Sequence, residues 1–103
     1  MKSLYIDDVR EIPVGYTHYA RTFDDARQML QYEDWDQISF DYDLGIPPQN
    51  NGYELMKLLK ELVVAGVRKA PQISVHTFFG GDIKYHMYKL RDEIEAYREK
   101  STE

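Results

Sequence analysis

Two short apolar segments of this chain end in pairs of aspartates. Residues 3–8 read SLYIDD, which ends in Asp7 and Asp8, and residues 38–45 read ISFDYDLG, which contains Asp41 and Asp43. Residues two apart in a strand point to the same side, so Asp41 and Asp43 are predicted to lie together. Neighbouring carboxylates repel each other unless a cation joins them, and their hard oxygen atoms suit Mg²⁺ or Mn²⁺. The four aspartates therefore predict a divalent metal site, with the capping of turns as the alternative for any single one.

Two further residues carry groups that bind phosphate or move protons. The guanidinium of Arg10 follows the first aspartate pair and can hold a phosphate oxygen, or else form a surface ion pair with Glu11. His76 comes directly after an apolar run. Imidazole titrates near neutral pH, which makes His76 a candidate general acid or base, with packing against a carboxylate as the alternative. His18 and His86 are distant from the aspartates in sequence and are predicted to have structural roles.

The predicted elements alternate between strands and helices, which favours an α/β layer with a mainly parallel four-stranded sheet. Strands are predicted over residues 3–6, 16–21, 35–40 and 72–75, and helices from Thr22, over residues 52–65 and from Asp82. Ligands of open parallel sheets bind beyond the carboxyl ends of the strands, so the aspartates and His76 meet at one edge if the first, third and fourth strands are neighbours. The loop between the first two strands has only about nine residues, fewer than a parallel crossover usually needs. Either this loop holds a helical turn or the second strand runs antiparallel.

Apolar residues at helical spacing predict which faces of the helices are buried. Thr22 is placed to cap the first helix, Gly66 to end the second and Asp82 to cap the third. The predicted apolar faces comprise Phe23, Ala26, Met29 and Leu30; Leu55, Leu58, Leu59 and Leu62; and Ile83, Met87, Leu90, Ile94 and Tyr97. The last stripe is predicted to cover the sheet in a monomer, with the seam of a weak homodimer through the C-terminal helix as the alternative.

The composition is that of one compact globular domain over residues 1–103. Hydrophobic residues make up 43% of the chain and charged residues 30%, which excludes a disordered polypeptide. The chain has no cysteine, so disulfides and thiolate metal sites are excluded and a cytoplasmic protein is expected. No apolar run suits a signal peptide or a membrane span. The net charge of −5 argues against binding to long duplex nucleic acid, which leaves short substrates gripped through a metal and a few cations.

Four segments, SLYIDDVR, FDYDLG, NGYELMKLLKEL and PQISVHT, resemble the receiver domain of bacterial response regulators in their order and spacing over residues 3–81. The resemblance implies a small flavodoxin-like fold in which Asp7 and Asp8 are metal-binding acids and Asp41 matches the phosphoacceptor. His76 stands where receivers carry a switch serine or threonine. The fifth receiver strand, with its phosphate-binding lysine, has no counterpart after the fourth strand and the long last helix, and the first receiver helix is missing as well.

The chain is similar to a narrower family, the cyclic-phosphate processing receiver-like domains of bacteria and phages. Their motifs are Asp-Asp-x-Arg, Asp-His-Asp-Leu-Gly and His-Ser. The first motif is intact at residues 7–10, the second has Tyr42 in place of histidine, and the third has Thr77 in place of serine. The Asn-Pro that usually follows is replaced by Phe79 and Gly80.

This second resemblance implies a Mg²⁺- or Mn²⁺-dependent phosphoesterase that acts on cyclic phosphates, such as RNA ends with a 2′,3′-cyclic phosphate or cyclic nucleotides. The implied roles are metal binding by Asp7, Asp8, Asp41 and Asp43, phosphate binding by Arg10 and Thr77, and catalysis by His76 and Asp41. A second hypothesis is a receiver-like interaction module without catalysis, which binds a protein partner through exposed tyrosines such as Tyr85 and Tyr88. A third is an ordinary phosphoacceptor domain, against which the missing lysine counts.

Overall fold

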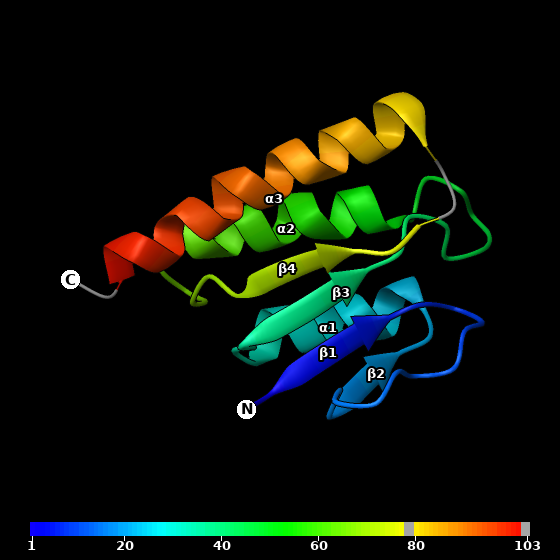
Figure 1. The fold of residues 1–103 in the computed structure, drawn as a ribbon, viewed down its shortest axis with the longest axis horizontal. Coiled ribbons are helices and arrows are strands. Elements are labelled where there is room, and N and C mark those ends of the chain that lie inside the picture. The colour runs from blue at the N-terminus through cyan, green and yellow to red at the C-terminus, as the bar shows by residue number, and fades with distance from the viewer. Residues whose placement is uncertain (78–79, 102–103) are drawn as a thin grey trace.

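The computed structural model describes residues 1–77 and 80–101 and confirms the small α/β fold. Its elements, in chain order, are β1 (Ser3–Ile6), β2 (His18–Ala20), α1 (Phe23–Tyr32), β3 (Gln37–Phe40), α2 (Gly52–Val64), β4 (Gln72–Val75) and α3 (Gly81–Ser101). The strands form one sheet in the order β2-β1-β3-β4, and all three pairings are parallel (Figure 1). β1, β3 and β4 are therefore neighbours, which is the condition for the aspartates and His76 to meet at one edge of the sheet.

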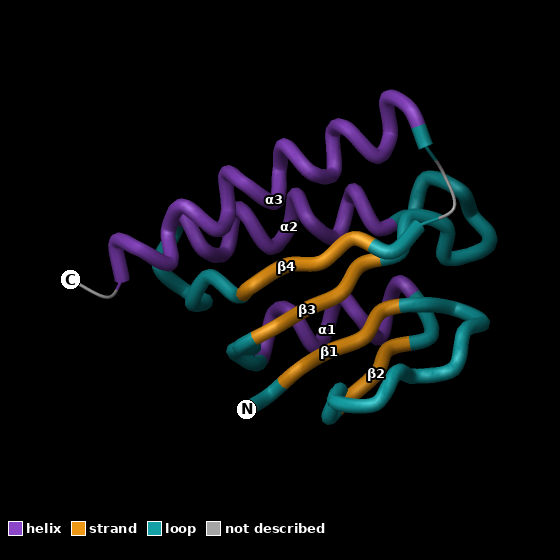
Figure 2. Tube along the Cα trace, viewed as in Figure 1, coloured by secondary structure: helices purple, strands orange, loops and turns teal. Residues whose placement is uncertain are grey.

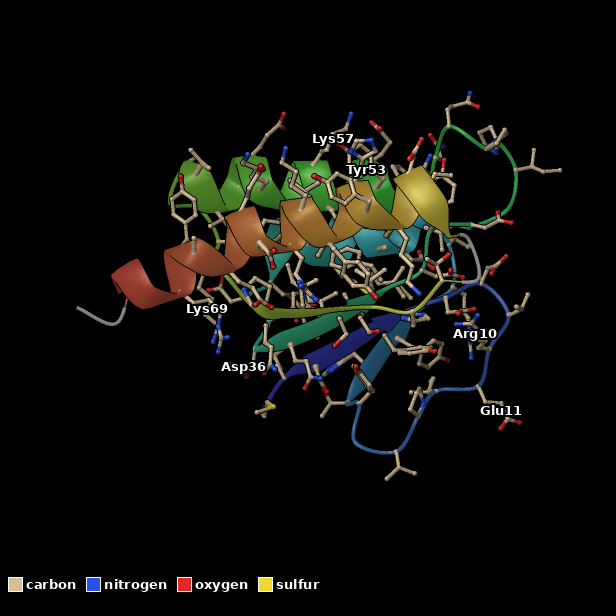
Figure 3. The ribbon with its side chains drawn as sticks, turned by 45° about the horizontal axis from the view of Figure 1, so that its top comes forward. Arg10, Glu11, Asp36, Tyr53, Lys57 and Lys69 are labelled. Atoms are coloured by element: carbon tan, nitrogen blue, oxygen red, sulfur yellow. The ribbon has the colours of Figure 1, made fainter. Side chains whose placement is uncertain are left out.

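The three helices lie on the same side of the sheet (Figure 3). The connections from β2 to β3 and from β3 to β4 move in the same direction across the sheet, and right-handed crossovers then place α1 and α2 on the same face. Alternate strand residues face these helices and form the core with them. The strands contribute Leu4, Ile6, Ile38, Phe40 and Ile73, and the helices contribute Ala26, Leu30, Leu55, Met56, Leu59, Val63, Met87, Leu90 and Ile94. The opposite face carries the other half of each strand, which is largely polar.

The link between β1 and β2 differs from both alternatives that its length suggested. β2 runs parallel to β1, and the connecting residues contain no helical turn. The loop instead crosses the helix-free face of the sheet, where the Ser3 hydroxyl donates a hydrogen bond to the carbonyl of Gly15 at 3.2 Å. The rings of Tyr5 and Tyr16 meet there edge to face with 5.2 Å between their centroids. The loop thus stands where a crossover helix would cover the sheet (Figure 2).

The helix boundaries follow from local capping chemistry. The hydroxyl of Thr22 accepts a hydrogen bond from the backbone of Asp25, and the side chain of Asn51 accepts one from the backbone of Glu54, so both are N-caps. Gly66 follows α2 with a φ of +76°, which confirms it as the glycine that ends this helix. The predicted cap at Asp82 is wrong, because α3 already begins at Gly81 and Asp82 lies in its first turn.

The long helix α3 packs on α2 and β4, which confirms that its apolar stripe covers the sheet. Met87, Leu90 and Ile94 are buried in the core, and Ile83 and Tyr97 pack against it. The carboxylate of Glu95 also accepts a hydrogen bond from the backbone N–H of Ile73 at 2.7 Å, on the outer edge of β4. Within the described residues, no helix is long and apolar enough to cross a membrane.

Candidate functional site

The carboxyl ends of three neighbouring strands hold the residues that the sequence singled out. The ladder of hydrogen bonds continues one residue beyond each strand: Asp41 donates its backbone N–H to Ile6 at 3.1 Å, and His76 donates to Phe40 at 2.9 Å. Asp7 likewise donates to Ala20 at 3.1 Å. The backbone therefore fixes Asp7, Asp41 and His76 in one row, and one potential metal-binding atom from each lies within 4.8 Å of the others.

Asp7 is fully buried and its two carboxylate oxygens have different surroundings. Its Oδ1 accepts hydrogen bonds from the backbone N–H groups of Val9 and Arg10, both at 2.9 Å. Its Oδ2 faces His76 Nε2 at 3.1 Å and Arg10 Nη1 at 3.6 Å. Burial alone would raise the pKa of Asp7, but these backbone N–H groups and the neighbouring side chains of His76 and Arg10 hold that pKa below its ordinary value. Asp7 is therefore ionised at neutral pH.

Asp41 is also buried, and its carboxyl group is less easily ionised. Its Oδ1 accepts a hydrogen bond from the backbone of Tyr42 at 2.8 Å, and its side chain is hydrogen bonded to Thr77. Burial and the negative charge of Asp7 outweigh these contacts and raise the pKa of Asp41 to about 6. The ionised form of Asp41 is therefore unfavourable at this buried edge beside Asp7 when no cation is bound.

His76 is held rigidly by two contacts that leave Nε2 directed at the carboxylates. Its ring stacks on Tyr5 with 4.3 Å between the centroids and an angle of 11° between the planes. Its Nδ1 is hydrogen bonded to the hydroxyl of Ser39 at 2.5 Å. Burial lowers the pKa of His76 in spite of the neighbouring Asp7 carboxylate, so the imidazole is neutral at pH 7.

Two arginines line the same edge. Arg10 Nη1 donates to the backbone carbonyl of His76 at 2.9 Å, which ties the loop after β1 to the end of β4. Arg21 donates through Nη1 to the carbonyls of Asp7, at 3.2 Å, and of Arg10. Figure 3 shows Arg10 at the carboxyl end of the sheet, opposite the end with Asp36. A positive charge therefore lies beside the two buried carboxylates.

The other two aspartates lie outside this row. Asp43 is exposed, and its Oδ1 accepts a hydrogen bond from the backbone of Gly45 at 3.0 Å, which is the geometry of a turn cap. Asp8 is partly buried and lies near the same turn, since a Cβ on Gly45 would come within 4.0 Å of its Oδ2. In the part of the chain that the structure describes, the group able to hold a metal ion comprises Asp7, Asp41 and His76. Metal binding by Asp8 and Asp43 stays a prediction.

Two residues of the site, Tyr5 and Ser39, were not anticipated from the sequence. Each lies two positions before an aspartate of the row, and residues two apart in a strand share a face. Ser39 is moreover a hydroxyl in the middle of a buried strand, where it needs a hydrogen-bond partner. The sequence features that could have identified these residues are their spacing from the aspartates and, for Ser39, a hydroxyl between two apolar residues of a strand.

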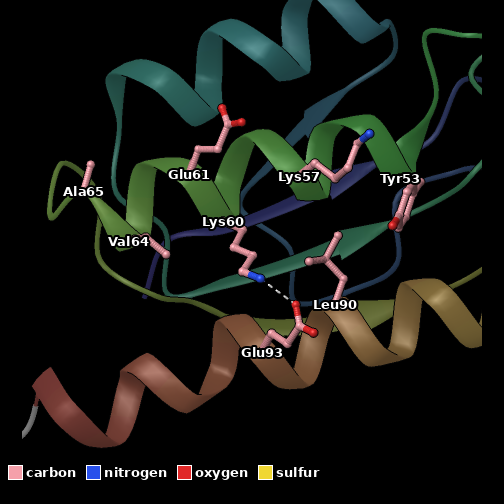
Figure 4. A pocket seen from close by; sticks show the side chains of 8 residues that line it. All are labelled: Tyr53, Lys57, Lys60, Glu61, Val64, Ala65, Leu90 and Glu93. Carbon is pink, nitrogen blue, oxygen red and sulfur yellow. Dashed lines mark hydrogen bonds and ion pairs between the residues drawn. The ribbon is translucent and has the colours of Figure 1, made fainter.

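A separate hollow lies on the helical side of the molecule (Figure 4). It has a volume of about 580 Å³ and lies between α2 and α3, where the ion pair of Lys60 with Glu93, 2.7 Å long, crosses it. Its lining residues are Tyr53, Lys57, Lys60, Glu61, Val64, Ala65, Leu90 and Glu93. This groove contains none of the predicted site residues.

A comparison of the chain with models of protein families identifies one family. The model of the cyclic-phosphate processing receiver domain matches residues 2–80. The chain belongs to this family. The match spans β1 to β4 and so includes every residue of the row at the carboxyl edge. No curated protein and no solved structure matches the chain in the corresponding comparisons.

The residues of the row fit the divalent ion that a receiver-like domain implies. Two carboxylates and one imidazole offer donor atoms within 4.8 Å of one another, and aspartate and histidine are both common metal ligands. At neutral pH the two carboxylates carry negative charge, whereas the imidazole is neutral. The raised pKa of Asp41 shows that this charge is costly without a cation. The donor set and its charge therefore suit a divalent cation.

Proposed function

We propose that this protein is a metal-dependent phosphoesterase that opens cyclic phosphates, with 2′,3′-cyclic phosphate ends of RNA or cyclic nucleotides as substrates. The observation that carries the proposal is the row of two buried carboxylates and one imidazole beside Arg10, at the edge of the sheet where α/β folds bind ligands. Membership of the cyclic-phosphate processing receiver family supports the substrate class.

The residues of the edge have complementary roles in this reaction. Asp7 and Asp41 would hold Mg²⁺ or Mn²⁺, which when bound polarises the phosphoryl oxygens and offsets their charge. Arg10 lies 3.6 Å from Asp7 and would stabilise the remaining charge on the phosphoryl oxygens. Thr77 is hydrogen bonded to the side chain of Asp41 and would contact the same phosphate. Water adds to phosphorus, one ribose P–O bond breaks, and the released ribose oxygen takes up a proton.

The reaction can be followed directly by ³¹P NMR. We expect 2′,3′-cyclic AMP to be converted to a phosphomonoester in the presence of Mg²⁺ or Mn²⁺, and to persist when the metal is chelated with EDTA. Asp7→Asn should abolish turnover because the buried Oδ2 atom loses its charge. Failure of the folded, metal-loaded protein to convert 2′,3′-cyclic AMP, 3′,5′-cyclic AMP and an RNA ending in a cyclic phosphate would refute the proposed function.

The different surroundings of the aspartates predict different effects on metal binding. In calorimetric titrations with Mn²⁺, Asp7→Asn should lose the site, whereas Asp43→Asn should bind almost as the unmodified protein does. Asparagine can still accept the hydrogen bond from Gly45, so the turn is preserved while the charge is removed. Loss of Mn²⁺ binding in Asp43→Asn would place this exposed carboxylate in the metal shell, as the sequence suggested.

A second candidate function, an interaction module for a protein partner, is supported by the groove between α2 and α3 (Figure 4). Leu90 and Val64 are apolar residues of its lining. Of the two tyrosines predicted to be exposed, Tyr85 on α3 is 61% exposed, whereas Tyr88 is partly buried, and neither lines the groove. This function needs neither a metal nor a cyclic phosphate. It would become the leading candidate if the substrates above stayed unchanged and the edge bound no divalent ion.

A further inference from the structure

We propose that His76 is the third protein ligand of the metal centre, through Nε2, and that the centre therefore prefers Mn²⁺ to Mg²⁺. This inference rests on the proposed function only in that a divalent ion binds at the carboxyl edge. It replaces the acid–base role that the sequence suggested for His76, because a lone pair committed to a metal ion is not free to accept a proton.

The spacing of the donor atoms supports direct coordination. Two ligand atoms that each lie about 2.1 Å from one ion, at a right angle, are about 3 Å apart. The distance between His76 Nε2 and Asp7 Oδ2 is 3.1 Å. Asp7 Oδ1 already accepts two backbone hydrogen bonds, which leaves Oδ2 as the atom directed toward His76. The same two atoms that now form a hydrogen bond are thus spaced as neighbouring ligands.

The second ring nitrogen of His76 is bound as in a metal-ligating histidine. Such histidines almost always donate the N–H of their other nitrogen to an oxygen, which fixes the orientation of the ring. Here that oxygen is the hydroxyl of Ser39, 2.5 Å from Nδ1 and only 3% exposed as a residue. The stacked ring of Tyr5 removes the remaining freedom of rotation. Ser39 and Tyr5 are therefore positioning residues for His76.

A hydroxyl at this position suits both the metal-free and the metal-bound protein. Serine can donate or accept a hydrogen bond, whereas a carboxylate or carbonyl can only accept. Without metal, Ser39 donates to Nδ1 and the Nε2–H of His76 donates to Asp7. With metal, Nδ1–H donates to Ser39 and the lone pair of Nε2 is free for coordination. The ring does not have to move between these two states.

The donor set accounts for the choice of metal. Mg²⁺ is bound in proteins chiefly through carboxylates, phosphates and water, whereas imidazole nitrogen suits first-row transition metals. A row of aspartates alone would favour neither ion strongly, but a nitrogen donor adds more stability to the Mn²⁺ complex than to the Mg²⁺ complex. The edge should therefore bind Mn²⁺ more tightly than Mg²⁺, with His76 as the cause.

The two other histidines of the chain provide controls, because neither faces this edge. His18 contacts Trp35, with 5.1 Å between ring centroids, and its Nδ1 is hydrogen bonded to Thr17. His86 lies on α3 beside Tyr85. Substitution of either one tests whether any histidine contributes to metal binding non-specifically.

The decisive experiment combines Mn²⁺ and Mg²⁺ titrations with pulsed EPR of the Mn²⁺-loaded, untagged protein. We expect a ¹⁴N coupling from one imidazole that disappears in His76→Phe and persists in His18→Ala and His86→Ala. Phenylalanine keeps a flat ring to stack on Tyr5, and the circular dichroism spectrum identifies folded protein. Mn²⁺ affinity should fall ~10–100-fold in Ser39→Ala and at least as far in His76→Phe, with a smaller change for Mg²⁺.

The outcomes separate this inference from the proposed function. Mn²⁺ binding without a ¹⁴N coupling, or with unchanged affinity in folded His76→Phe, would overturn the coordination by His76 and leave the carboxylate metal site intact. The absence of any divalent ion binding in the unmodified protein would instead overturn the proposed function itself. A coupling lost only in His76→Phe, together with a reduced preference for Mn²⁺, is the result expected.

Discussion

Replacement of Gly52 by alanine is expected to destabilise the protein by about 3 kcal/mol or more, at the upper end of what overpacking costs. A Cβ on Gly52 would lie 1.8 Å from the backbone oxygen of Asp41 and 2.8 Å from its backbone carbon. These are main-chain atoms of the residue that follows β3, so they cannot rotate away as a side chain would. The start of α2 and the end of β3 must separate, and Asp41 leaves its place in the row.

Gly80→Ala is the matched control for this change. A Cβ on Gly80 would meet nothing within 4 Å and this glycine is exposed, so its substitution should change stability by no more than ~0.5 kcal/mol. Urea denaturation of the two variants and the unmodified protein measures both effects. If Gly52→Ala proved as stable as Gly80→Ala, α2 would not approach Asp41 as closely as described.

In metal-free protein near pH 8, Asp41→Asn is expected to increase stability by ~2 kcal/mol. The pKa of Asp41 is about 6 in the folded protein against an ordinary value of 3.8, so the folded state binds this proton more tightly than the unfolded state. The contribution of Asp41 to stability is therefore fully present below pH 3.8 and is lost as the pH rises through 6. Asparagine is uncharged and keeps an oxygen that can accept the hydrogen bond from Tyr42.

Thermal or urea denaturation in EDTA at several pH values checks this prediction. The difference between the variant and the unmodified protein should be small near pH 4 and should grow up to about pH 7. Asp43→Asn serves as the control, since that carboxylate is exposed and should show no such trend. A destabilised Asp41→Asn at pH 8 would mean that the ionised carboxylate is favourable without a cation, contrary to the electrostatics of the edge.

The sequence predicted the order of the elements and the edge where the polar residues meet, because both follow from short-range patterns. Apolar strands that end in Asp7, Asp41 and His76 identify the carboxyl ends of a parallel sheet. The direction of β2 could not be predicted in this way. It depends on how the loop crosses the helix-free face and on contacts such as that of Ser3 with Gly15, which join residues distant in sequence.

Sequence patterns also could not predict which of the four aspartates are buried at the site and which lie outside it. Asp7 and Asp8 are adjacent, and only the packing of the strand end determines that Asp7 is fully buried while Asp8 lies at the rim. The prediction that Asp41 and Asp43 share a side assumed that the strand continues. β3 ends at Phe40 and its hydrogen-bond ladder ends at Asp41, and Asp43 instead caps a turn at Gly45. Regular alternation does not apply beyond the last strand residue.

The tie between His76 and Ser39 illustrates why the role of a single residue is hard to predict from its type. The sequence suggested that His76 transfers protons, since imidazole often does. Its partners in space are a hydroxyl on β3, an aromatic ring on β1 and a buried carboxylate, none of them adjacent to it in sequence. Only their combination suggests the metal coordination that we propose for His76.

Anomalous diffraction from crystals soaked in Mn²⁺ tests the central claim, that the carboxyl edge of the sheet is a metal centre, most directly. We predict one strong peak at this edge, within bonding distance of carboxylate oxygens of Asp7 and Asp41 and of Nε2 of His76. Crystals of Asp41→Asn should show a weaker peak or none. An edge without a peak at saturating Mn²⁺, or Mn²⁺ bound only elsewhere on the surface, would contradict the claim.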